Sequence, residues 1–305
     1  MLLHKDKEAF EDILAQTDDE HQKRIDVGML EKDYYVTMML RKLSESAIGF
    51  IFKGGTSLSK CYKVIDRFSE DIDLTVSQHL TQGQRREMAD TIMAVGETIG
   101  LKLQNKEQIQ RRRNFNRYVF EYESVFATST VRPQIIVETF ITILAFPVIQ
   151  GKIDSFVGET LAKYDEDAVR EFELEPFTML VMDIRRTFVD KVFALCDYYL
   201  AGQSERYSRH IYDIYQILEH ISLADIDRQL VEEVRNERLK DSRCVSVQEE
   251  HNPTKILAEI VSTSYFKTDY EKITEMLLFT RIPYEQAITA IEKIVESGIF
   301  TSRGV

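Results

Sequence analysis

The sequence predicts an α/β (α+β) fold, in which a mixed β-sheet flanked by helices is followed by a mostly helical C-terminal domain. In the first half, short segments alternate apolar and polar residues with the period of a strand, and helical patterns separate them. Beyond about residue 155 this alternation fades, and apolar residues recur at three- and four-residue spacing. Only 12 Gly and 5 Pro occur in 305 residues, so few residues interrupt helices.

We therefore expect two domains, at residues 1–155 and 156–305. In the first domain, helices are predicted over residues 5–16, 22–45, 57–64 and 84–99, and strands over 48–52, 70–76, 117–124 and 133–140. In the second domain, helices are predicted over 187–202, 207–221, 223–238, 255–262, 268–279 and 284–297. The acidic stretch 158–176 is expected to be a connecting or surface segment.

Charge and cysteine content exclude several classes of protein. The 39 Lys and Arg against 51 Asp and Glu give a net charge of −12, so nucleic acid would need a local basic patch. The three cysteines are far apart and show no disulfide or metal-binding spacing. No signal peptide and no apolar run of about 18 residues occurs. We expect a soluble, reduced, cytoplasmic protein without a membrane partner.

Asp71 and Asp73 are the first candidates for chemistry. Alternate residues of a strand leave its backbone on the same face, roughly 6.5–7 Å apart. Ile72 and Leu74 would then point into the core and hold the acids in place. Two carboxylates so placed repel each other unless a cation lies between them, and Mg²⁺ usually takes one or two carboxylates plus substrate phosphates. The pair therefore indicates a divalent metal site.

A glycine turn precedes the acidic pair. Gly54-Gly55 lies between an apolar strand and a short helix, so the backbone can approach a ligand closely and the helix start favours phosphate. The hydroxyls of Thr56 and Ser57 could add hydrogen bonds to that phosphate. Arg67 could neutralise phosphate, and Ser69 could bind nucleotide or cap the turn. The segment therefore predicts phosphate binding beside metal binding.

These two blocks carry a family resemblance. Gly54-Gly55-Thr56-x-Leu58 followed by Arg67-Phe68-Ser69-Glu70-Asp71-Ile72-Asp73-Leu74 resembles the AbiEii/AbiGii toxin family. That family belongs to the polymerase-β-like nucleotidyltransferases and includes the MenT toxins. The helix containing Glu31-Lys32-Asp33-Tyr34-Tyr35 resembles the one that often precedes this block in the family. The resemblance implies a nucleotidyltransferase fold at 1–155, with the helical domain contributing to the nucleotide or acceptor site.

The resemblance also implies further site residues. A third carboxylate is expected on a later neighbouring strand, where Glu138 fits the pattern and Glu121 is the alternative. In the helical half, Lys191 and the run Arg209-His210-Ile211-Tyr212-Asp213 resemble two later motifs, with His210 at a position that is more commonly acidic. This implies that Lys191 and Arg209 contact nucleotide and that Asp213 lies near the active site.

Each of these residues also has a structural explanation. A D-x-D pair and a strand–Gly-Gly–helix turn are common by themselves, and Glu138 would suit an exposed edge strand. The two blocks together are more specific than either alone. The alternative ion pairs are Arg67 with Asp66 or Glu70, and Lys191 with Asp190 or Asp197.

The function implied is that of a nucleotidyltransferase toxin of a toxin–antitoxin system, of the kind associated with abortive phage infection. It would transfer a nucleotide from an NTP to an acceptor hydroxyl, most simply the 3′ end of tRNA, by two-metal chemistry with Mg²⁺, or Mn²⁺ as an alternative. Asp71, Asp73 and Glu138 would hold the metal ions, and an AbiEi-like antitoxin would be the partner. The alternatives are nucleotidylation of a protein hydroxyl and a non-catalytic nucleotide-binding regulator.

A basic run offers a surface for the acceptor. Residues 111–118, RRRNFNRY, place four Arg beside Phe115 and Tyr118, a composition typical of phosphate binding with base stacking. The alternative is a solvated hairpin tip.

Overall fold

The computed structural model describes residues 1–20, 25–111, 113–126, 129 and 131–301. It divides into two compact units, one formed by Met1–Tyr62 and Ser69–Val181 and the other by Lys63–Phe68 and Met182–Val305. Residue 155, where the sequence places a domain boundary, lies inside the first unit. The sheet of that unit is completed only by a strand at 177–182, which pairs with the strand at 51–53.

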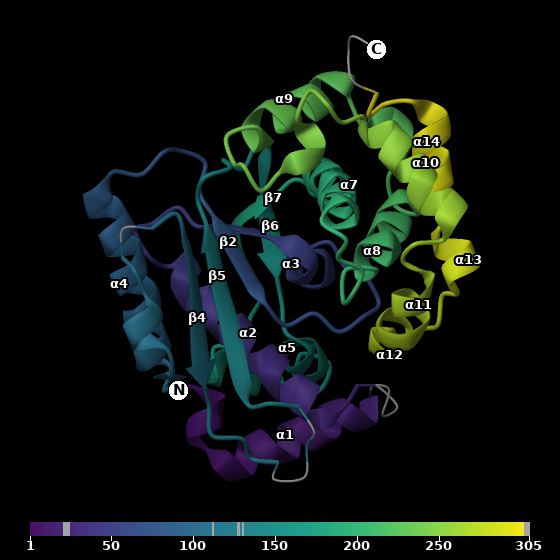
Figure 1. The fold of residues 1–305 in the computed structure, drawn as a ribbon. Coiled ribbons are helices and arrows are strands. Elements are labelled where there is room, and N and C mark those ends of the chain that lie inside the picture. The colour runs from purple at the N-terminus through teal and green to yellow at the C-terminus, as the bar shows by residue number, and fades with distance from the viewer. Residues whose placement is uncertain (21–24, 112, 127–128, 130, 302–305) are drawn as a thin grey trace. The chain divides into compact units, whose positions relative to one another are not determined.

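The first unit contains a seven-stranded mixed sheet with the order β3-β4-β5-β2-β1-β7-β6. Strand β1 pairs antiparallel with β2 and parallel with β7, β2 pairs parallel with β5, and β4 pairs antiparallel with β3 and β5. Figure 1 shows the long strands β4 and β5 beside β2. The strands are β1 Ile51–Lys53, β2 Ile72–Thr75, β3 Lys102–Leu103, β4 Phe115–Glu121, β5 Gln134–Phe140, β6 Val148–Ile153 and β7 Phe177–Met182.

Helices pack against one face of this sheet, and the side chains between the helices and the sheet form the core of the unit. Four adjacent strands each place an apolar or aromatic side chain on this face. These side chains, which are all fully buried, are Phe52, Leu74, Val137 and Tyr118. Helices α2 and α4 contact each other on this side, and Gly96 of α4 lies against the ring of Phe120. The helices of the unit are α1 Lys7–Glu20, α2 Val27–Ser44, α3 Gly54–Lys60, α4 Gln82–Thr98, α5 Phe156–Leu161 and α6 Glu166–Glu171.

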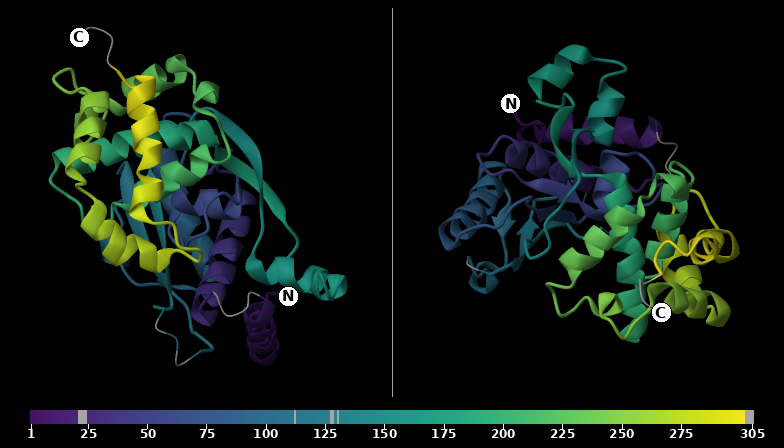
Figure 2. Two further views of the ribbon diagram at one scale, coloured as in Figure 1. Left: turned by 90° about the vertical axis from the view of Figure 1, so that its right-hand side faces the viewer. Right: turned by 90° about the horizontal axis from the view of Figure 1, so that it is seen from above.

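The second unit is helical in its described residues. Helix α7 packs on α8, and α10 and α14 lie side by side (Figure 1 and Figure 2). Residues 63–68 belong to this unit because their backbone pairs with it: the Phe68 amide donates to Leu277, and the Phe279 amide donates to Asp66. Its helices are α7 Ile184–Leu200, α8 Arg209–Leu218, α9 Arg228–Arg238, α10 Pro253–Thr263, α11 Lys267–Asp269, a π-helical turn Tyr270–Thr274, α12 Glu275–Leu277, α13 Tyr284–Ala287 and α14 Thr289–Ser297.

The predicted fold class, a mixed sheet with helices followed by a helical region, is confirmed. Strand β7 is not among the predicted strands, because it is an interior strand with the apolar sequence MLVM and therefore lacks alternation. The expected connecting or surface segment 158–176 contains the end of α5 and all of α6, and residues 162–167 within it are exposed. Within the described residues, no helix combines the length and apolar character needed to cross a bilayer.

Candidate active site

Four charged residues form one row across the sheet of the first unit. Asp73 of β2 is the register partner of Lys53 on β1 and of Glu138 on β5, and Glu138 is the register partner of Arg117 on β4. Register partners place their side chains on the same face. The row therefore runs cation, acid, acid, cation on the face opposite the α2–α4 core.

Asp71 joins the acidic centre of this row. It lies two residues before Asp73, and Ile72 and Leu74 between and after them are fully buried, so the two carboxylates leave the chain on the same side. Burial, then Asp73 and Asp71, raises the pKa of Glu138, and Arg117 and Lys53 act in the opposite direction. Three carboxylates thus act on one another electrostatically.

Gly54 makes room for the Asp73 carboxylate. Its φ of +79° lies in the left-handed region, and a Cβ at this position would lie 2.1 Å from Asp73 Oδ2. Gly54 is also the first residue of α3, which begins directly after Lys53. The sequence predicts a glycine for close ligand approach, and the structure adds a second requirement: the acid itself needs the space.

The hydroxyls near this turn have partners within the protein. Thr56 Oγ1 donates to the Asp71 carbonyl at 2.6 Å and lies 2.9 Å from Ser69 Oγ. Ser57 Oγ donates to the Gly54 carbonyl at 2.8 Å, and both Thr56 and Ser57 are buried. These bonds tie the glycine turn to the acidic segment. Direct phosphate contacts from Thr56 and Ser57 stay predictions.

Three consecutive charged residues of α2 support the same segments. Lys32 is buried and forms an ion pair with Glu70, the residue immediately before Asp71. Asp33 accepts from Lys60 at the end of α3 at 2.6 Å and from the first amide of α5 at 3.1 Å. Glu31 accepts from the loop after β4, and burial raises its pKa. The sequence signal for this support is the charged run within an otherwise apolar helix.

The second unit contains a buried cluster around Asp213. Arg67 donates to both carboxylate oxygens of Asp213, from Nε at 2.7 Å and Nη2 at 2.8 Å, and Lys191 Nζ donates at 2.6 Å. Neither ion pair is one of the alternatives considered from the sequence, because both cations converge on α8. Burial alone would raise the pKa of Asp213, but the charges and hydrogen bonds of Arg67 and Lys191 hold it well below its usual value.

This cluster has an excess of positive charge. Arg209 stands in the first turn of α8 and pairs with no carboxylate among the described residues. Burial lowers the pKa of Lys191 in spite of Asp213, and the charges of Arg67 and Arg209 add to this effect. Burial also lowers the pKa of His210 well below its usual value, so the ring is neutral. Arg67 and Lys191 therefore share one carboxylate while the charge of Arg209 acts on the same cluster, which favours an anionic ligand.

The carboxylates of the first unit suit a divalent cation that shares its ligands with a substrate. Within the described residues, no group of three or more His, Cys, Asp or Glu side chains is arranged to hold a metal ion by itself. Glu138 is engaged by Arg117, whose Nε lies 3.5 Å from Glu138 Oε1. Asp71 and Asp73 leave the chain on the same side two residues apart, which matches the way Mg²⁺ binds one or two carboxylates together with phosphates.

The described residues of the basic run 111–118 differ in their exposure and in their ion pairs. Arg112 lies outside the described residues, and Arg111 forms an ion pair with Asp90 on α4. Tyr118 is fully buried on the core face and is not available for base stacking, which corrects that expectation. Phe115 is 41% exposed and lies on the same face as Arg117.

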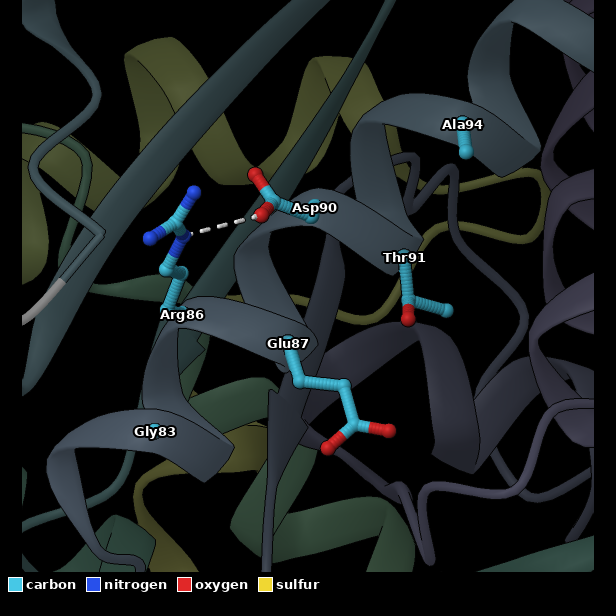
Figure 3. A pocket seen from close by; sticks show the side chains of 6 residues that line it. All are labelled: Gly83, Arg86, Glu87, Asp90, Thr91 and Ala94. Atoms are coloured by element: carbon cyan, nitrogen blue, oxygen red, sulfur yellow. Dashed lines mark ion pairs between the residues drawn. The ribbon is translucent and has the colours of Figure 1, made fainter.

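A separate hollow of about 490 Å³ lies on the exposed side of α4 (Figure 3). Its lining residues all come from this one helix, and Figure 3 shows the ion pair between Arg86 and Asp90 at its rim. None of the predicted site residues lines this hollow.

Comparison with known proteins decides the family. A family model described as nucleotidyl transferase AbiEii toxin of type IV toxin–antitoxin systems matches residues 38–295, most of the chain. The chain belongs to the AbiEii family. The matched range includes every predicted site residue, from Gly54 to Asp213, so AbiEii membership and the geometry concern the same part of the molecule.

A solved structure supports the fold of this AbiEii chain. The chain is similar to MenT4, a nucleotidyltransferase toxin from Mycobacterium tuberculosis H37Rv, with a TM-score of 0.50 and 14% sequence identity over 95% of this chain and 94% of MenT4. At that identity the likeness concerns the fold. No curated protein matches the sequence. The protein is therefore a member of a nucleotidyltransferase toxin family with the fold of MenT4.

Proposed function

We propose that this AbiEii protein transfers a nucleotide from an NTP to an acceptor hydroxyl in a divalent-metal-dependent reaction. The acceptor hydroxyl loses its proton to solvent and its oxygen forms a bond to the α-phosphorus, while the bond from that phosphorus to the α–β bridging oxygen breaks and pyrophosphate leaves. The observation that carries the proposal is the alignment of Asp73 with Glu138 across β2 and β5, with Asp71 two residues earlier on the same face.

In the first unit, Asp71, Asp73 and Glu138 are the proposed ligands of Mg²⁺, with Mn²⁺ as the alternative. The bound cation would supply charge stabilisation for the attacking and leaving oxygens. Gly54 and Gly55 would bring backbone amides to the phosphates. Ser69 and Thr56, which are linked at 2.9 Å, would hold this turn against the Asp71 segment, and Ser57 would hold it through the Gly54 carbonyl.

In the second unit, Lys191 and Arg209 are the proposed phosphate contacts, because Lys191 shares Asp213 with Arg67 and Arg209 forms no ion pair within the described residues. Asp213 would act as a positioning residue that fixes Lys191 and Arg67 in a buried cluster. The proposed role of Arg67 is then indirect, since its Nε and Nη2 both donate short, buried hydrogen bonds to Asp213. Catalysis of this kind rests on positioning and electrostatics.

The proposed acceptor is the 3′ end of tRNA, and the proposed partner is an AbiEi-like antitoxin. The family supplies the acceptor hypothesis, and the exposed Phe115 beside Arg117 fits a nucleic-acid strand, which binds by phosphate contacts and stacking. An acceptor hydroxyl on a protein is the competing outcome of the same experiment.

The test is a transfer assay with purified protein, Mg²⁺ and each α-³²P-labelled NTP separately, offered either tRNA or whole-cell protein. We expect label on tRNA and none on protein. The matched variant is Asp73→Asn, which keeps the shape and removes one acidic ligand, and we expect at least a 100-fold loss of transfer and of growth arrest. Label on protein alone would refute the tRNA acceptor, and full activity of Asp73→Asn would refute the metal-dependent reaction.

A further inference from the structure

Lys53 is the one member of the charged row that the sequence did not indicate. It is the last residue of β1 and directly precedes Gly54, and its register partner is Asp73. The side chain is half-buried, and Nζ lies 5.6 Å from the centre of the Phe140 ring. A cation over an aromatic face is held in place without being neutralised.

The two cations of the row differ in their partners. Arg117 is engaged by Glu138, with Nε 3.5 Å from Oε1. Lys53 forms no ion pair with any carboxylate in the described part of the chain, although Asp73 is its register neighbour. An ammonium group has three donors and no acceptor, so an anion is its natural partner.

The position of Lys53 indicates which anion its ammonium group would bind. Its backbone directly precedes the Gly54-Gly55 turn, and its side chain extends over the acidic face, where its charge acts on Glu138. On the other side of the acids, Arg117 lies on β4, three strands from Lys53 on β1, next to the exposed Phe115. The two ends of the row therefore differ. Lys53, which precedes the glycine turn, forms no ion pair within the described residues, whereas Arg117, next to the exposed Phe115 ring, is paired with Glu138.

We infer that Lys53 binds the triphosphate of the donor nucleotide directly, and that the Arg117 end of the row does not. This inference rests on the proposed function and adds the residue and the end of the row that receive the donor. Lys53 is thus a binding residue for phosphate, and its contact is independent of the base.

The experiment measures the Kd of a fluorescent, α,β-methylene NTP analogue, with and without Mg²⁺, for the full chain and its variants. We expect Lys53→Gln to raise the Kd about 10- to 100-fold in both conditions, because one charge-assisted hydrogen bond is lost. Lys53→Arg, which keeps the charge, should recover part of the affinity. Lys102→Gln, which removes one positive charge on exposed β3, should leave the Kd within about twofold in both conditions. Arg117→Gln, which removes the charge paired with Glu138, should leave the Kd without Mg²⁺ within about twofold.

Several outcomes would overturn the inference. An unchanged Kd for Lys53→Gln, a change seen only with Mg²⁺, or an equal change for Arg117→Gln without Mg²⁺ would each exclude a direct contact at this end. If the wild-type chain bound no NTP and transferred no nucleotide, the proposed function would fail together with it. If the wild type bound and transferred normally while Lys53→Gln matched it, this inference alone would fail. Kd values are compared only for variants whose melting temperatures lie within a few degrees of that of the wild type. If Lys53→Gln does not fold, the Kd of Lys53→Arg is compared with that of the wild type instead.

Discussion

Asp213→Asn should destabilise the helical unit strongly, because it removes the carboxylate that two buried cations share. Arg67 and Lys191 make three hydrogen bonds to Asp213 at 2.6–2.8 Å, and these residues are 4%, 7% and 0% exposed, in that order. Asparagine has the same shape, but its NH₂ group faces a cationic donor. Breaking a buried ion pair by removing one partner typically costs about 3–5 kcal/mol, a large part of a domain's stability. Urea unfolding followed by circular dichroism measures the loss.

The pH dependence tests the same reasoning independently. The pKa of Asp213 in the folded chain lies well below the unfolded value of 3.8, so its contribution is complete above that pH and is lost as pH falls through the folded pKa. The difference between wild type and variant should therefore be constant from pH 8 to 5 and shrink below about pH 4. The control is Glu285→Gln, which breaks an exposed pair with Lys267 and should have a much smaller effect. A loss below about 1 kcal/mol at pH 7 would refute the buried clamp.

Three further changes probe the first unit. Gly54→Ala should lower the free energy of unfolding by about 1–2 kcal/mol, because an alanine is strained in the left-handed backbone conformation. It should also abolish transfer, since the new Cβ would displace the Asp73 carboxylate. Melting curves measure the first effect, and the labelled transfer assay measures the second. A double-mutant cycle of Lys32→Met and Glu70→Gln should give a coupling energy of about 1–3 kcal/mol, and additive effects would contradict the support from α2. Glu138→Gln should raise the melting temperature at pH 7 in the absence of divalent cations, because the raised pKa of the Glu138 carboxyl makes its ionised form destabilising. This gain should vanish as the pH falls towards 4.5, where the carboxyl is protonated. A gain that persists at that pH would argue against the charge effect.

Much of the acidic centre could be predicted because it depends on local periodicity. The i, i+2 spacing of Asp71 and Asp73 fixes a shared face once Ile72 and Leu74 are buried, and no long-range information is needed. Glu138 needed the family pattern, because only pairing between β2 and β5 places it beside Asp73. The strand β7 could not be recognised from alternation, since an interior strand next to β1 is apolar on both faces.

The ion pairs could not be predicted, because they depend on which helices meet. Sequence neighbours such as Asp190 were the plausible partners for Lys191, yet Lys191 on α7 contacts Asp213 on α8. Asp190 instead pairs with Arg186 and Arg238. Helical periodicity tells which side of α7 faces inward, but it does not give the neighbour that supplies the opposite charge.

His210 illustrates how a departure from a family pattern can acquire a physical meaning. The family resemblance implies that an acidic residue is commoner at this position, and an acid there would add a second negative charge beside Asp213. The imidazole is neutral because burial lowers its pKa, and its Nδ1 has no hydrogen-bond partner among the described residues. Asp213 is the carboxylate that Lys191 and Arg67 share, and the charge of Arg209 acts on Lys191 as well. With His210 at this position the cluster carries one negative charge fewer than an acidic residue would give it, which favours the phosphate contacts proposed for Lys191 and Arg209.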